Sequence, residues 1–66
     1  MAYDDLRRMA ELHEDAFEKH SKLSMAHWII GDVKESKRQF SMAMEAAVEA
    51  LSWRHRLSKL EKLNDY

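Results

Sequence analysis

Three evenly spaced histidines are the residues best suited to chemistry in this sequence. His13, His20 and His27 recur every seven residues, so on a helix they drift only about 20° around the axis per step. Residues seven apart are also separated by about 10.5 Å along a helix, whereas one zinc ion needs its nitrogen ligands at about 2.0–2.1 Å. We therefore expect no metal site and no cofactor within one chain. A metal would need histidines from two chains, or a ligand from a second helix.

The alternative role for these histidines is packing, with hydrogen bonds to a neighbouring helix. An antiparallel partner helix would bring Ser36 roughly opposite His27 and Glu49 roughly opposite His13. A half-buried neutral imidazole without a carboxylate partner resists protonation, and stability is lost when acid forces the charge on it. The row His13, His20 and His27 therefore predicts an assembly that loosens between about pH 6.5 and 5.

Other catalytic chemistry has little support in the composition. The 66 residues include no Cys, no Pro and one Gly, 35% of them are charged, and the formal net charge is −1. Without cysteine there is no disulfide, thiolate metal site or thiol nucleophile. The near-neutral, mixed charge argues against strong non-specific binding of nucleic acid. We expect a protein that is not an enzyme.

A basic segment near the C-terminus supports the alternative function. Its cations follow an aromatic residue, Trp53, and this combination can bind nucleic-acid phosphates. Basic residues are also expected at the end of a helix because they complement its dipole, so we rank nucleic-acid contact second. The candidate contacts are Arg54, Arg56, Lys59 and Lys62.

The elements that position these residues are predicted to be two long helices. Helix-favouring residues dominate, and the clear interruption is Gly31-Asp32, where Gly31 can end one helix and Asp32 can cap the next. Glu35 follows at capping-box spacing. We expect one all-α domain over residues 1–66, with helices over about 3–30 and 33–63 joined by a turn at 31–32. A break near Ser21–Ser24, giving three helices, is the structural alternative.

The apolar residues predict more than a hairpin. The first helix has a stripe from Leu6 to Ile30, and the first half of the second helix is expected to bury Val33, Phe40, Ala43, Met44, Ala47, Val48 and Leu51. Further apolar residues lie off these stripes, and surface of that kind usually marks an interface. We expect two antiparallel hairpins to dimerise into a four-helix bundle. The expected interface residues are Met25, Trp28, Ile29, Met42, Ala46, Trp53, Leu57 and Leu60.

The stretch from Trp28 to Ala43 resembles the central part of one tetratricopeptide repeat. An aromatic residue, Gly31, small Ser36, Phe40 and Ala43 stand at the intervals of that repeat. The sequence departs from it at His20 and Ser24, and it lacks the closing proline. The resemblance implies a tightly packed helical hairpin, with Ser36 and Ala43 allowing the helices to approach.

The block from Ala16 to Trp28 is similar to small helical accessory proteins from the early, exo–xis region of lambdoid bacteriophages. This resemblance implies a non-enzymatic regulator of phage development or host physiology in the host cytoplasm. The sequence has no apolar run of the roughly 18 residues that a bilayer span needs, so we expect a cytoplasmic protein. Its expected partners are a second copy of itself and another protein, with no membrane.

Overall fold

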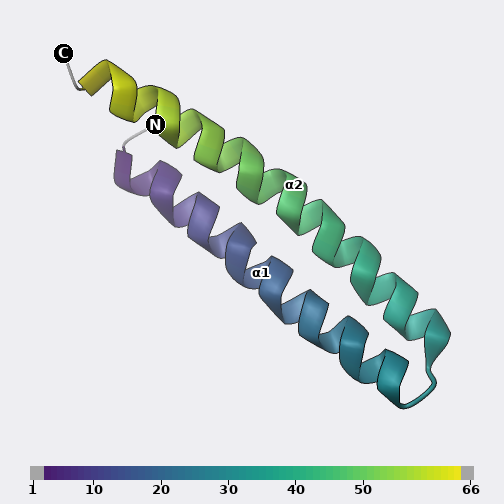
Figure 1. The fold of residues 1–66 in the computed structure, drawn as a ribbon. Coiled ribbons are helices and arrows are strands. Elements are labelled where there is room, and N and C mark those ends of the chain that lie inside the picture. Colours follow the sequence, from purple (N-terminus) through teal and green to yellow (C-terminus); the bar gives the residue numbers. More distant parts are fainter. Residues whose placement is uncertain (1–2, 65–66) are drawn as a thin grey trace.

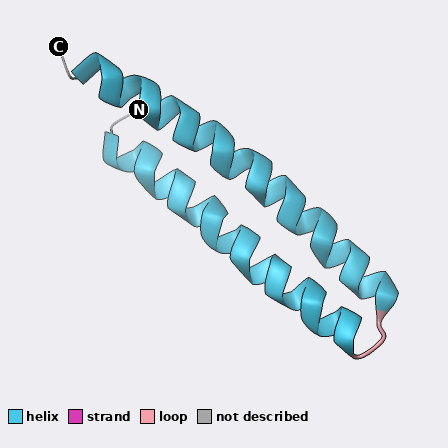
Figure 2. Ribbon diagram, in the orientation of Figure 1, coloured by secondary structure: helices cyan, strands magenta, loops and turns pink. Residues whose placement is uncertain are grey.

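The computed structural model describes residues 3–64 as two helices that form a hairpin. Helix α1 spans Tyr3–Ile29 and helix α2 spans Val33–Asn64. The helices run antiparallel and side by side along nearly their whole length, and no strand occurs between residues 3 and 64 (Figures 1 and 2). The prediction of an all-α hairpin is confirmed. Helix α1 continues unbroken through Ser21 and Ser24, so the three-helix alternative is wrong.

The connection between the helices is built from two local capping motifs. Gly31 has a φ of 85°, and its N–H donates to the Trp28 carbonyl at 3.1 Å while the Asp32 N–H donates to the His27 carbonyl at 2.8 Å. This pair of bonds is the Schellman motif, which requires a left-handed residue where Gly31 stands. Asp32 Oδ1 then accepts the Glu35 N–H at 3.2 Å and caps α2.

The capping box itself is only half formed. In a complete box the Glu35 carboxylate would accept the Asp32 N–H, but that N–H is already bonded to the His27 carbonyl. The Glu35 carboxylate instead accepts hydrogen bonds from Arg38 and Gln39. The hydrogen bond from the Asp32 N–H to the Glu35 carboxylate is therefore absent, because the N–H belongs to the Schellman motif and the carboxylate is bonded to Arg38 and Gln39.

The two helices meet along a line of mostly small side chains, which we call the inner seam. On α2 its members follow the alternating three- and four-residue spacing of a heptad pattern. The large apolar members of the seam are Leu6, Trp53, Leu57 and Leu60, and alanine, serine and histidine make up most of the rest. The seam comprises Leu6, Ala10, His13, Ala16, His20, Ser24 and His27 on α1, and Ser36, Gln39, Ala43, Ala46, Ala50, Trp53, Leu57 and Leu60 on α2.

The predicted core of α2 is on the wrong face. Ala43 is buried and Ala47 half-buried as expected, but the larger members of the expected stripe lie in solvent, with exposed fractions of 55% for Phe40, 67% for Val48 and 71% for Leu51. Val33 and Met44 are also exposed. The face that the sequence analysis assigned to a second chain, with Ala46, Trp53, Leu57 and Leu60, packs against α1 instead. Small side chains occupy the inward-facing positions of α2 because they allow the two helices to approach each other closely.

Candidate interaction surface

A reciprocal pair of serines joins the two helices across the inner seam near the turn. Ser24 Oγ donates to the Ser36 carbonyl at 2.9 Å, and Ser36 Oγ donates to the Ser24 carbonyl at 2.8 Å. A side chain that reaches the opposite backbone in both directions requires the two helices to lie close together. This contact agrees with the approach of the helices expected at Ser36. The register of the two helices differs from the expected one, because Ser36 faces Ser24 rather than His27.

The middle histidine belongs to a hydrogen-bonded network that crosses the seam. His20 Nδ1 lies 2.6 Å from Gln39 Oε1, and Gln39 Nε2 donates to Glu35 Oε1 at 3.0 Å. Since the Gln39 amide donates toward a carboxylate, its oxygen must accept, so His20 carries its proton on Nδ1. Arg38 completes the network with hydrogen bonds of 2.8–3.1 Å to Glu35. Donation from Arg38 and Gln39 lowers the pKa of Glu35 to about 2.

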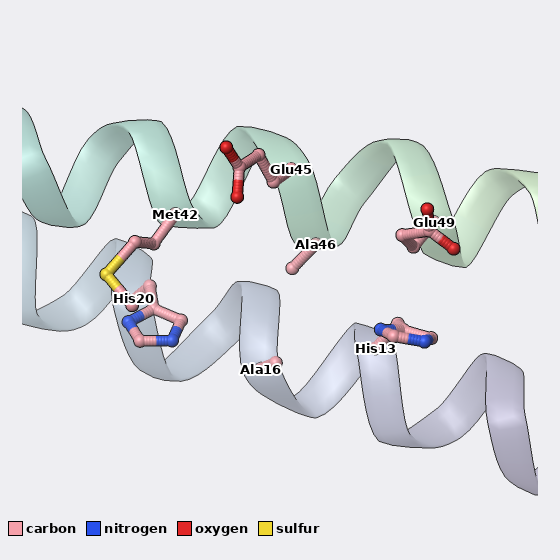
Figure 3. Close-up of a pocket in the computed structure, with 7 residues that line it drawn as sticks. All are labelled: His13, Ala16, His20, Met42, Glu45, Ala46 and Glu49. Carbon is pink, nitrogen blue, oxygen red and sulfur yellow. The ribbon is translucent and has the colours of Figure 1, made fainter.

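The first two histidines open onto a shallow groove on one side of the hairpin. The groove has a volume of about 270 Å³. Figure 3 shows His13 near Glu49 and His20 near Met42, with Ala16 and Ala46 between them. Glu49 therefore lies near His13, as the antiparallel register predicted. Within residues 3–64 no group of three or more His, Asp or Glu side chains is placed to hold a metal ion.

The other side of the hairpin carries the largest exposed apolar side chains, which we call the outer face. A hollow of about 450 Å³ lies between the helices. Five of these side chains line it: Phe17, Met25, Trp28, Phe40 and Met44. The line continues along α2 at helical spacing in both directions. The outer face comprises Phe17, Met25, Trp28, Val33, Phe40, Met44, Val48 and Leu51.

The eight residues expected at an interface divide into two groups. Met25, Trp28, Ile29 and Met42 are exposed, and the first two belong to the outer face. Ala46 and Leu57 are 6% and 3% exposed, so they have almost no surface left for a second chain. Trp53 and Leu60 are half-buried in the seam.

The exposure of the larger α2 residues Phe40, Val48 and Leu51 was not predicted from the sequence, which placed them in the core. The heptad spacing of the small residues from Ser36 to Leu57 is the signal that would have separated the seam from the outer face.

Two of the four candidate nucleic-acid contacts are engaged within the hairpin. Arg54 forms a bidentate pair with Glu14, at 2.6 and 2.9 Å, and this pair lowers the pKa of the Glu14 carboxyl. The Arg56 guanidinium stacks 4.6 Å from the centre of a Trp53 ring. Lys59 and Lys62 are exposed. Arg54 and Arg56 are thus held by contacts within the hairpin and are less available to a nucleic acid than the sequence suggests.

The geometry defines a class of structure, the antiparallel two-helix hairpin with one apolar outer face. Comparison with known proteins adds no assignment, because no family model, curated protein or solved structure significantly matches the chain. Neither α1 nor α2 contains a segment long and apolar enough to cross a membrane. The functional interpretation of the hairpin therefore rests on its outer face.

Proposed function

We propose that this protein is a small, non-enzymatic interaction module that works as a homodimer, with two hairpins packing their outer faces into a four-helix bundle. One observation carries the proposal. Eight large apolar side chains form the exposed outer face, whereas the inner seam is built mainly from alanine, serine and histidine. Exposed apolar surface of this extent marks an interface.

The accessible area of the hairpin supports a second copy as the occupant. The chain exposes 5205 Å², whereas a compact monomer of 7.9 kDa would expose about 4400 Å². The excess of about 800 Å² equals what each partner buries in an interface of standard size. A dimer would therefore bring this elongated chain, 53 Å in its longest dimension, to the surface area of a compact protein.

The arrangement of the outer face also suits twofold pairing. The pairs Ser24–Ser36 and His20–Gln39 fix the antiparallel register, which places Phe17 and Met44 near the middle of the face. Trp28 then lies toward the turn and Leu51 toward the opposite end. A twofold axis through the middle would set Trp28 of one copy against Leu51 of the other, as an isologous interface requires.

The remaining parts of the proposal concern the wider role. We propose that the dimer regulates another protein in the cytoplasm, and that it is a phage accessory modulator, as its resemblance to exo–xis region proteins implies. The apolar surface that dimerisation leaves uncovered, including Ile29 at 74% exposure, is available to that partner. Nucleic-acid binding is the competing function, although Arg54 and Arg56 already have intramolecular partners.

Sedimentation equilibrium with a matched pair of variants tests the dimer. Leu51 and Leu12 are both exposed leucines, at 71% and 58%, but Leu12 lies one turn before Ala16, on the side of the His–Glu groove. The wild type and Leu12→Glu should sediment at twice the chain mass, and Leu51→Glu at the chain mass with its helical circular dichroism retained. A monomeric wild type, or a dimer that tolerates Leu51→Glu, would overturn the proposal. A salt-sensitive gel shift with random DNA would favour the competing function.

A further inference from the structure

The third histidine occupies a different environment from the other two. His27 lies in the last turn of α1, and its Nδ1 is buried without a hydrogen-bond partner among residues 3–64. Asp32 Oδ2 lies 3.6 Å from this nitrogen, which is beyond normal hydrogen-bond reach. The other Asp32 oxygen already caps α2 through the Glu35 N–H. A free carboxylate oxygen thus faces an unpartnered ring nitrogen across the turn.

The charged groups nearest His27 come from the start of α2. Asp32 and Glu35 contribute two carboxylates from the start of α2, and Glu35 is itself paired with Arg38. The charge on His27 contributes to the lowered pKa of Glu35, although Arg38 and Gln39 are the larger causes. Within one turn on α1 the neighbours of His27 are uncharged. The C-terminal end of a helix also stabilises a cation through its dipole.

We propose that His27 is a proton-operated clasp for the hairpin turn. When His27 is protonated, Nδ1–H donates to Asp32 Oδ2 and ties the end of α1 to the N-cap of α2. When it is neutral, this tie weakens to the backbone bonds of the Schellman motif alone. The clasp therefore strengthens in acid, because protonation gives the imidazole both the charge and the second N–H that the tie uses.

For His27, the effect of acid on stability is opposite in sign to the effect expected from the sequence for the whole histidine row. Acid loosening was predicted for histidines without a carboxylate partner, and His27 has Asp32 beside it. His20 does not share the property, because its Nδ1–H already donates to Gln39. The row therefore does not act as a unit, and its member at the turn responds to acid in the opposite direction.

A double-mutant cycle at two pH values tests the clasp. The variants are His27→Gln, Asp32→Asn and the double variant; asparagine is as good an N-cap as aspartate, so Asp32→Asn removes the charge and retains the cap. Unfolding followed by circular dichroism at pH 7.5 and 5.5 gives the coupling between the two positions. Contributions from the other ionisable groups are common to all four proteins and cancel in the cycle.

We expect the coupling to rise by about two- to fivefold in the unfolding equilibrium constant between pH 7.5 and 5.5. A coupling that is unchanged or smaller at pH 5.5 would overturn the proposal. The clasp lies within one chain and does not depend on the proposed dimer. Repeating the cycle in the Leu51→Glu background separates the two, because loss of the dimer should leave the coupling unchanged.

Discussion

The inner seam and the outer face differ in the size of their apolar side chains. In the seam, Ala10 and Ala43 are 0% and 1% exposed, whereas on the outer face Val48 and Leu51 are 67% and 71% exposed. Small residues let two helices approach until Ser24 and Ser36 reach the opposite backbone. Burial alone would have placed the larger residues inside. The difference shows that close fit and cross-helix hydrogen bonds orient the hairpin, which leaves the larger side chains of the outer face exposed.

The same comparison separates two kinds of stability. Replacing a seam residue should change the free energy of unfolding of each hairpin, whatever the protein concentration. Replacing an outer-face residue should change association, and therefore stability only through the concentration of folded dimer. Variants on the two surfaces can test this division directly.

The largest effect is expected in the seam. Ala43→Leu inserts a branched side chain where the helices meet, and overpacking of this kind costs about 1–3 kcal/mol. Urea unfolding followed by circular dichroism should show a lower midpoint at every protein concentration. Ala26→Leu, at an exposed alanine of α1 outside both surfaces, is the matched control and should leave the midpoint nearly unchanged. Equal losses for the two variants would contradict the assignment of the faces.

An intermediate effect is expected at the centre of the outer face. Phe40→Ala removes an aromatic side chain that is 55% exposed in the single hairpin. If Phe40 is an interface anchor, its loss should raise the dimer dissociation constant by tenfold or more. Sedimentation over a dilution series measures this constant. A variant that lowers stability equally at all dilutions would instead place Phe40 in the hairpin core.

The smallest effect is expected where an exposed ion pair joins the two helices. Arg54→Ala removes the bidentate partner of Glu14, and solvent screens an exposed pair of this kind, so its contribution to stability is small. Because Arg54 lowers the pKa of Glu14, the pair stabilises the fold above the ordinary carboxyl range, and this contribution is lost as pH falls through the folded pKa.

Unfolding curves recorded for wild type and Arg54→Ala should therefore differ near pH 7 and converge in acid. The difference should also shrink in high salt. A gap between the two proteins that widens in acid would show that Arg54 acts through something other than Glu14.

The hairpin and its turn were predictable because their causes are local. Gly31 supplies the left-handed residue that ends α1, and Asp32 supplies the cap that begins α2, each within a few residues. The placement of Glu49 near His13 also followed, since antiparallel helices of similar length have few registers. Half of the predicted capping box does not form, because the Asp32 N–H donates to the His27 carbonyl at the end of the preceding helix.

The face of α2 that packs inward was not predictable from apolar size. Phe40 and Leu51 form a good helical stripe, and so do Ala46 and Leu57 on another face. Only the second stripe brings Gln39 opposite His20 and Ser36 opposite Ser24. Those polar pairs depend on residues 12 and 19 positions apart in sequence, so no local pattern contains them.

By itself, the sequence determined two long helices, the position of the turn and the presence of two apolar faces. Helix propensity and capping act over a few residues, and they leave the pairing of faces open. The tertiary structure alone decided that alanine and serine face inward and that Phe40, Val48 and Leu51 face out. The physical reason is that helices pack where their backbones can approach and their buried polar groups can pair, and these conditions exist only when both helices are present.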